Sequence, residues 1–449
     1  MKILLLIFTA LFSLITQLYS QVLPSPRQVQ WQQMETTLFA HFTVNTFTDK
    51  EWGDGTESPS VFNPSAFDAR QWVKAAKDGG FKMIILTAKH HDGFCLWQSK
   101  FTEHSVKNSL WKDGKGDVVK EVSDACKEAG LKFGIYLSPW DRHEPKYGTN
   151  AYNEHYKNQL RELLTNYGEI SEVWFDGAKG ENAKNMNYDF QGYWNIVRQL
   201  QPNAVIFSDI GPDVRWVGNE NGNASESSWA TINTEGMDVG KADSKYLNTG
   251  DSNGKLWIAP ETDVSIRKGW FYHESENNSV KTPQQLVDLY YKSVGRNSLL
   301  LLNIPPNKNG LFEKNDIASV KEMRSILNET FEKNLAKNKA IYLLTDNKLN
   351  TDIPLKIGQI WEIDFKNNMQ FDRIMLQENI NKGQMIEAIS LQYWDGINWQ
   401  TLCNASTIGY KRLLKTNLVE TSKVRMKINR AKGTINLAEI GFYKASLRE

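Results

Sequence analysis

Apolar runs and helical patterns alternate along the chain from about residue 35 to residue 330. Short apolar runs predict strands at residues 38–42, 83–87, 133–137, 173–176, 204–209 and 299–303. Between them, apolar residues at helical spacing predict helices. One is expected to begin at a capping box formed by Ser65 and Asp68, and another is expected to end at Gly130. Strands this apolar are buried on both faces, so the pattern predicts a parallel sheet covered by helices.

A closed barrel and an open doubly wound sheet both fit this strand-then-helix order. No glycine-rich dinucleotide fingerprint follows the first strand, and polar residues follow most of the strands instead of gathering at one point. This distribution favours a (β/α)8 TIM-like barrel, an α/β fold. The pattern loosens over residues 211–273, where long polar segments surround the apolar run at 256–259.

A different periodicity marks the end of the chain. After a helix predicted over 317–331, residues alternate between apolar and polar with period two, as at 389–393 and 424–428. Asp395-Gly396 follows one of these runs and is a strong hairpin signal. We therefore predict a barrel domain over 21–335 and an antiparallel β-sandwich over 336–449, packed together because no low-complexity linker separates them.

The first twenty residues have the features of a secretory signal peptide. A basic start at Lys2 precedes an apolar run over 3–15, and Ser20 is a small residue before Gln21. An uncleaved membrane anchor fits less well, because the run is short and polar residues interrupt it. No later segment predicts a membrane span, so we expect an exported protein that is periplasmic or extracellular.

Charge and cysteine content exclude several functions. The 53 basic and 52 acidic residues leave a formal net charge of +1, which does not favour binding to nucleic acid or an anionic membrane. Three scattered cysteines form no disulfide framework, and no Cys/His spacing resembles a zinc site. The sequence thus predicts no metal and no cofactor, and it carries no signal for the oligomeric state.

Candidate chemistry gathers at the predicted strand ends. Asp176 is the clearest case, because an apolar run delivers it to a strand end and Gly177 follows. The polar and aromatic residues at or beyond these ends are His41, Glu51, Trp52, His90, His91, Asp92, Tyr136, Trp140, Asp176, Glu220, Glu261 and Trp270. Paired carboxylates suit glycoside hydrolysis, while histidines can bind hydroxyl groups and tryptophans can face a sugar ring.

Other interpretations of these residues remain open at this stage. Asp176 could be a turn or N-cap residue, and Glu220 and Glu261 could be surface loop acids. His90, His91 and Asp92 could serve a metal-dependent hydrolase, although adjacent residues at a strand end point apart. The same aromatic pocket would also suit a carbohydrate-binding protein without catalysis.

Five motifs resemble those of α-L-fucosidases of glycoside hydrolase family 29. They are Ala-His-Phe-Thr-Val-Asn-Thr-Phe at 40–47, Glu-Trp-Gly-Asp-Gly at 51–55, Lys-His-His-Asp-Gly-Phe at 89–94, Val-Trp-Phe-Asp-Gly at 173–177 and Gly-Trp-Phe-Tyr-His at 269–273. The stretches at 45–48 and 216–220 resemble the subfamily that prefers α-1,3/1,4-linked fucose. One departure is Phe42-Thr43 after the first histidine, where the family often has a glycine.

The resemblance implies an exo-acting retaining α-L-fucosidase that releases fucose from α-1,3/1,4-fucosylated oligosaccharides or glycans. Asp176 matches the family nucleophile and Glu220 matches the acid/base, with Glu261 as its rival. The C-terminal segment resembles a galactose-binding-type sandwich. The residues expected to bind the fucose are His41, Glu51, Trp52, His90, His91, Tyr136, Arg215, Glu261 and Trp270.

Overall fold

The computed structural model describes residues 21–449, so the predicted signal peptide lies outside the described residues. Eight parallel strands close into a barrel, in the spatial order β1-β10-β9-β6-β5-β4-β3-β2. This confirms the predicted barrel. Its strands are β1 (Thr36–Ala40), β2 (Met83–Lys89), β3 (Lys132–Leu137), β4 (Glu172–Trp174), β5 (Val205–Ser208), β6 (Val214–Trp216), β9 (Ala259–Ser265) and β10 (Leu299–Asn303).

Large aromatic side chains fill the barrel interior, because alternate residues of each strand point inward. Trp174 stacks on Phe207 with ring centroids 4.1 Å apart and an angle of 5° between the planes. Phe39 and Tyr136 pack edge-on against Trp174, each with a centroid distance of 5.2 Å. These four rings form a packed layer, and the polar residues that follow in the same strands lie beyond it.

Helices cover the outside of the barrel and bury a second apolar layer against the outward faces of the strands. The helices of the barrel domain are α1 (Pro26–Gln32), α2 (Val44–Thr48), α3 (Ala69–Asp78), α4 (Val118–Ala129), α5 (Asn150–Asn166), α6 (Phe190–Leu200), α7 (Ser244–Thr249), α8 (Pro283–Lys292) and α9 (Lys314–Phe331). Short 3-10 helices are η1 (Pro59–Val61), η2 (Val106–Asn108), η3 (Trp111–Gly114), η4 (Glu274–Glu276), η5 (Tyr342–Leu344) and η6 (Ile380–Lys382).

The helix ends agree with the sequence pattern in one case and correct it in another. Gly130 ends α4 with a φ of 68°, a left-handed conformation that favours glycine. The expected capping box of Ser65 and Asp68 is wrong, because Asp68 itself is the N-cap of α3 and accepts hydrogen bonds from the N–H groups of Arg70 and Gln71. Ser65 instead donates to Asn309.

The second half of the barrel departs from strict alternation of strands and helices. Only residues 209–213 join β5 to β6, and they contain no helix. A long connection then runs from β6 to β9, and it contains α7 and a two-stranded sheet of β7 (Thr231–Ile232) and β8 (Leu256–Trp257). This region matches the part of the sequence, 211–273, where the repeating pattern loosens.

The C-terminal part is an antiparallel sheet of six strands with its own apolar core, which confirms the predicted β domain. The strand order is β11-β16-β12-β15-β13-β14, and Asp395-Gly396 lies between β13 and β14. We call this unit the C-terminal sheet. Its strands are β11 (Ile353–Leu355), β12 (Ile360–Glu378), β13 (Ile386–Trp394), β14 (Trp399–Ala405), β15 (Arg412–Ala431) and β16 (Ile435–Tyr443).

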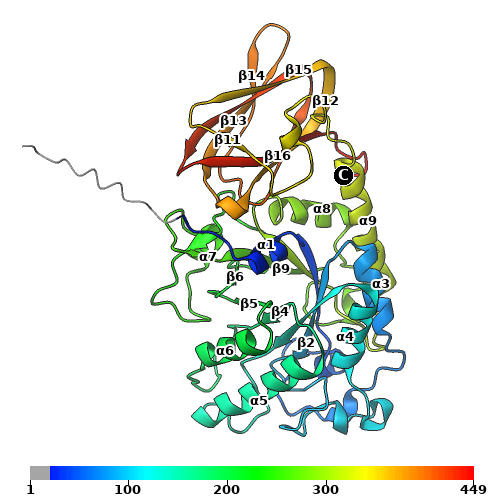
Figure 1. Cartoon of the computed structure of the whole chain (residues 1–449). Helices are drawn as coiled ribbons and strands as arrows, with labels where there is room; N and C mark the ends of the chain where they lie inside the picture. The colour runs from blue at the N-terminus through cyan, green and yellow to red at the C-terminus, as the bar shows by residue number, and fades with distance from the viewer. Residues whose placement is uncertain (1–20) are drawn as a thin grey trace, which may run out of the picture.

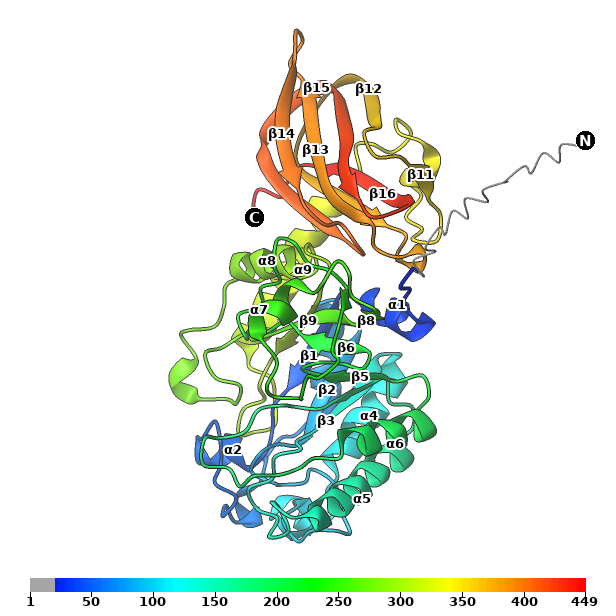
Figure 2. The same cartoon turned by 90° about the vertical axis from the view of Figure 1, so that its left-hand side faces the viewer.

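The C-terminal sheet stacks on the barrel domain beside α8 and α9 (Figures 1 and 2). A β-bridge joins Arg296 of the barrel domain to Arg412 of the sheet. Near this bridge, Glu35 accepts hydrogen bonds from Tyr410 at 2.8 Å and from Lys411. The two parts therefore share buried polar contacts. Along residues 21–449, no helix combines the length and apolar character needed to cross a membrane.

Candidate active site

A pocket of about 320 Å³ opens at the carboxyl ends of the barrel strands. Most of the residues predicted from the strand ends meet there, together with aromatic residues of the barrel interior. Its lining includes Phe39, His41, Trp52, His90, His91, Tyr136, Trp174, Asp176, Phe207, Asp209, Trp216, Glu220, Asp263 and Trp270.

Asp176 is oriented by three neighbours at the end of β4. It lies two residues beyond Trp174 and therefore follows the inward series of that strand. Its Oδ2 accepts a hydrogen bond from the Tyr136 hydroxyl at 2.9 Å, and its Oδ1 accepts one from the Ala178 N–H at 2.7 Å. The Nε2 of His91 lies 3.6 Å from Oδ2. The carboxylate is thus fixed in one orientation at the pocket floor.

Three buried histidines line one side of the pocket. Burial lowers the pKa of His41 to about 3 and that of His91 to about 4, and it lowers the pKa of His90 well below its usual value. The Nδ1 of His41 lies 2.8 Å from Asn303 Oδ1, and the Nδ1 of His91 lies 2.7 Å from Ser138 Oγ. With Nδ1 engaged, the Nε2 of His41 and of His91 remains as one neutral donor or acceptor for a sugar hydroxyl group.

Glu220 enters the pocket from the connection after β6. The indole N–H of Trp270 donates to Glu220 Oε2 at 3.2 Å. Burial raises the pKa of Glu220, and the charges of Asp176 and Glu51 add to this effect, although the Trp270 hydrogen bond opposes it. Glu220 therefore keeps its proton to a higher pH than a free glutamate does.

Glu51 does not line the pocket but binds a segment that does. Its carboxylate accepts hydrogen bonds from the Trp270 N–H at 2.8 Å and the Phe271 N–H at 3.0 Å, and it lies 2.7 Å from His273 Nε2. It thereby holds the segment that carries Trp270. Its neighbour Trp52 does line the pocket, and 46% of that residue remains exposed.

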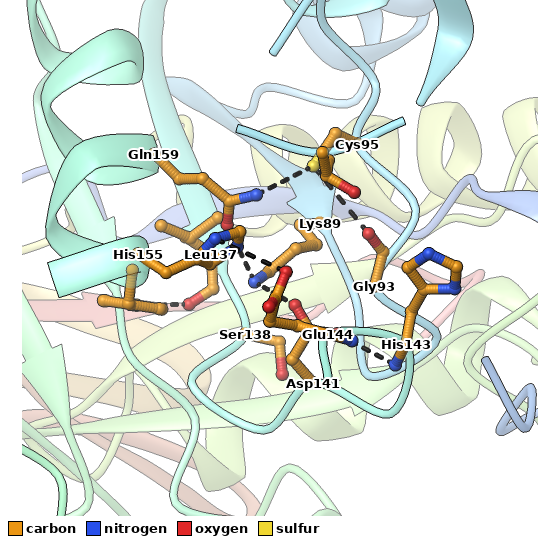
Figure 3. A network of polar contacts seen from close by, with 12 residues as sticks. Lys89, Gly93, Cys95, Leu137, Ser138, Asp141, His143, Glu144, His155 and Gln159 are labelled. Atoms are coloured by element: carbon orange, nitrogen blue, oxygen red, sulfur yellow. Dashed lines mark hydrogen bonds and ion pairs between the residues drawn. The ribbon is translucent and has the colours of Figure 1, made fainter. Parts of the chain in front are cut away.

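A buried ion pair fixes the segment that follows β3, as Figure 3 shows. The Lys89 ammonium donates to Asp141 at 2.8 Å and to Gln159 at 3.0 Å. Asp141 also accepts from the N–H groups of residues 143 and 144. Burial alone would raise the pKa of Asp141, but the charge of Lys89 and these hydrogen bonds lower it. The same segment carries Trp140, whose ring centroid lies 4.8 Å from that of His91.

Glu261 and Arg215 do not line the pocket, unlike most of the other residues predicted to bind the sugar. Glu261 points inward from β9, but it lies two residues before Asp263 and therefore deeper, where the Trp174 indole donates to it at 2.9 Å. Arg215 lies between two inward-facing residues of β6 and so points outward. Its guanidinium binds only backbone oxygens, those of residues 229, 247 and 258.

Glu261 forms a buried pair of carboxyl groups with Glu172. Both residues are fully buried, and the negative charge of Glu172 adds to the rise in the pKa of Glu261. The Trp31 indole also donates to Glu172 at 2.8 Å. Burial raises the pKa of Glu172 to about 8 and that of Glu261 well above its usual value. At least one carboxyl of the pair is therefore protonated at neutral pH, since two buried carboxylates would repel each other.

This pair predicts a pH-dependent stability. Because the folded pKa of Glu172 is raised, its stabilising effect is complete below the unfolded pKa and is lost as the pH rises towards 8. The melting temperature of the wild type should therefore fall between pH 5 and pH 8. We expect this fall to be roughly 2–4 °C smaller in Glu172→Gln. Glu128→Gln, which removes an exposed acid, should leave that drop unchanged. Equal drops in wild type and Glu172→Gln would contradict the assignment.

Sequence reasoning missed Asp209, Asp263, Trp216 and Asn303. Asp209 follows β5 as Asp176 follows β4, and burial together with the charge of Asp176 raises its pKa to about 6. Asp263 accepts a hydrogen bond from the Trp216 indole at 2.9 Å. Both acids were detectable, since each continues the inward series of its strand, Asp209 two residues after Phe207 and Asp263 two residues after Glu261. Asn303 contacts His41, a pairing across strands that no local pattern shows.

Residues 21–449 hold no cluster of three or more His, Cys, Asp or Glu side chains arranged to bind a metal ion. Asp92, the third member of the suggested metal site, contacts other groups. Its carboxylate accepts from the Thr43 hydroxyl at 2.8 Å and from the Phe94 N–H at 2.7 Å.

A parallel barrel whose strand ends present carboxyl groups, neutral histidines and tryptophans to one pocket is typical of glycoside hydrolases. Residues 12–332 match the α-L-fucosidase family, and the chain belongs to that family. It is 44% identical to α-L-fucosidase 1 of Arabidopsis thaliana over 446 residues, which cover 94% of this chain and 87% of the plant protein. The chain is accordingly an α-L-fucosidase, and a retaining mechanism is typical of such enzymes in glycoside hydrolase family 29.

Solved structures agree with this assignment. A glycoside hydrolase family 29 member from an unknown rumen bacterium superposes with a TM-score of 0.88 at 42% identity, covering 95% of this chain and 78% of the other. A Ruminococcus gnavus family 29 fucosidase in complex with fucose also gives a TM-score of 0.88, at 34% identity and with 95% of both chains covered.

Proposed function

We propose that this chain is an exo-acting retaining α-L-fucosidase that removes fucose from α-1,3/1,4-fucosylated oligosaccharides or glycoconjugates. In this proposal, Asp176 is the nucleophile and Glu220 is the acid/base. The observation that supports it best is the contrast between the two carboxyl groups in one pocket. Asp176 accepts hydrogen bonds from two donors, as an anion does, whereas burial raises the pKa of Glu220.

The chemistry then follows two displacements. Asp176 attacks the anomeric carbon while Glu220 gives its proton to the glycosidic oxygen, so the sugar–oxygen bond breaks and a fucosyl ester forms on Asp176. Glu220, now a carboxylate, removes a proton from water. The resulting oxygen attacks the anomeric carbon, releases the Asp176 carboxylate and yields fucose with its original anomeric configuration.

The remaining pocket residues would bind the sugar. His41, His90 and His91 offer neutral donors and acceptors to its hydroxyl groups, and Trp270 and Trp52 present flat apolar faces to the ring and its methyl group. The pocket lies at one end of a barrel whose interior is filled, so it can accept the terminal sugar of a chain. This geometry favours exo-action.

The linkage preference can be tested by competition between substrates. We expect kcat/KM for a Lewis-type trisaccharide, with α-1,3- or α-1,4-linked fucose, to exceed that for an α-1,2-fucosylated lactose by at least about tenfold. The motifs at 45–48 and 216–220 motivate this expectation. Fucose released from each substrate is measured under identical conditions. Equal values, or a preference for the α-1,2 linkage, would refute the proposed specificity while leaving the fucosidase activity intact.

A further inference from the structure

Side chains of the C-terminal sheet hold part of the connection that follows β6 and contains Glu220. The segment in question is 226–230, between β6 and β7. The Ser228 N–H donates to Thr407 Oγ1 at 2.9 Å. The Gln384 amide accepts from the Ala230 N–H at 2.8 Å and donates to the Ser228 carbonyl at 2.9 Å. One glutamine side chain thus pairs with two backbone groups, as a neighbouring strand would.

The start of the same segment is held by an arginine from β15. Arg412 donates through Nη1 to the Glu226 carbonyl at 2.7 Å and through Nη2 to the Glu226 carboxylate. Ser406 also donates to the Glu226 carbonyl, at 2.6 Å. Gln384, Thr407 and Arg412 are each at most 5% exposed. Water cannot easily replace the buried hydrogen bonds of Gln384 and Thr407, so their loss would leave backbone groups without partners, whereas the Glu226 side chain bound by Arg412 is exposed.

The opposite side of the segment is joined to the barrel strand that leads to Glu220. Arg215 of β6 donates to the Trp229 carbonyl at 2.8 Å and is fully buried. The next residue in the strand, Trp216, lines the pocket, and Glu220 lies four residues further on. The position of the segment therefore influences the end of β6 and the residues that enter the pocket after it.

We propose that Gln384, Thr407 and Arg412 are positioning residues for the fucosidase reaction. They hold segment 226–230, and through Arg215 they hold the strand end from which Glu220 reaches the substrate. This inference rests on the assignment of Glu220 as acid/base. It gives the C-terminal sheet a role in proton transfer, because a displacement of a catalytic group by about 1 Å can lower its rate contribution 100-fold.

The test compares two leaving groups in the full-length protein. A fucosylated trisaccharide needs a proton from Glu220 for its leaving oxygen, whereas α-L-fucosyl fluoride loses fluoride with little help from an acid. We expect Gln384→Ala to lower kcat/KM, which reports formation of the fucosyl ester, about tenfold more for the trisaccharide than for the fluoride. The matched control is Gln392→Ala, because Gln392 lies in the same sheet and contacts Arg425 instead of the barrel.

A purely structural role predicts a different result. If Gln384→Ala and Thr407→Val reduce turnover of both substrates equally, whether or not the melting temperature falls, the positioning role is refuted. Thr407→Val removes a single hydrogen bond, so it decides the question if Gln384→Ala does not fold. Glu220→Ala, assayed alongside, separates the two hypotheses. If the loss of activity depends on the leaving group in Glu220→Ala but not in the Gln384 and Thr407 variants, only the positioning proposal is overturned. If the loss in Glu220→Ala does not depend on the leaving group, the acid/base assignment is overturned.

Discussion

Replacing Asp176 with alanine is expected to lower kcat/KM for every fucoside by at least about 10⁴-fold, a loss similar to that of other enzymes without their nucleophile. The reason is that no other pocket group can form the covalent ester at the same place. Tyr136 and the Ala178 N–H, which orient the Asp176 carboxylate, would face an empty site. Rates are measured with a Lewis-type trisaccharide and with α-L-fucosyl fluoride.

The matched control is Asp209→Ala, since Asp209 occupies the equivalent position after the next strand and also lines the pocket. Asp209 accepts a hydrogen bond from the Gly240 N–H at 2.8 Å, so it supports a loop and should matter less. Melting temperatures with and without fucose show whether each variant still folds and binds the sugar. A loss of less than 100-fold in Asp176→Ala, or an equal loss in Asp209→Ala, would remove Asp176 as the nucleophile.

The stereochemistry of an azide product gives a second readout. In Asp176→Ala, azide can occupy the vacated space and attack the fucosyl fluoride directly. A single displacement inverts the anomeric centre, so the product is β-L-fucosyl azide. Detection of the α product in this variant would show that another residue still forms the covalent intermediate.

Much of the fold could be predicted because apolar strands and helix signals act locally. The run before Asp176 shows a buried strand, and the alternation of inward and outward positions explains why that acid reaches the pocket. The same alternation places Arg215 outside and Asp263 inside. Arg215 was nevertheless predicted to bind the fucose and Asp263 was not, because neither residue stands at the end of a clear apolar run.

Depth within the barrel was harder to predict than direction. Glu261 points inward, as a catalytic acid must, but it lies below the aromatic layer and pairs with Glu172. Its depth depends on the stagger of neighbouring strands, which no single segment encodes. Contacts between segments far apart in the sequence could not be predicted either. The Gln384 side chain accepts a hydrogen bond from the Ala230 N–H, although the two residues are 154 positions apart, and neither local sequence predicts this contact.

Replacement of Glu220 should affect substrates with different leaving groups unequally. We expect Glu220→Ala to lower kcat/KM for the trisaccharide by about 10²–10⁴-fold, because general acid catalysis typically contributes that much. Turnover of α-L-fucosyl fluoride should fall less, since fluoride leaves without a full proton transfer. Glu261→Gln is the control, because Glu261 is buried beneath the pocket and should show no such difference between the two substrates.

Azide and pH then identify the role of Glu220. In Glu220→Ala, Asp176 still forms the fucosyl ester, and azide needs no base to attack it, so azide should raise the rate and yield α-L-fucosyl azide by double displacement. In wild type, the raised pKa of Glu220 means that kcat/KM falls at high pH as this acid loses its proton. Glu220→Gln cannot ionise, so that fall should disappear. A β-azide product, or the same alkaline fall in Glu220→Gln, would assign the acid/base role to a different group, with Asp263 the next carboxyl in the pocket to replace.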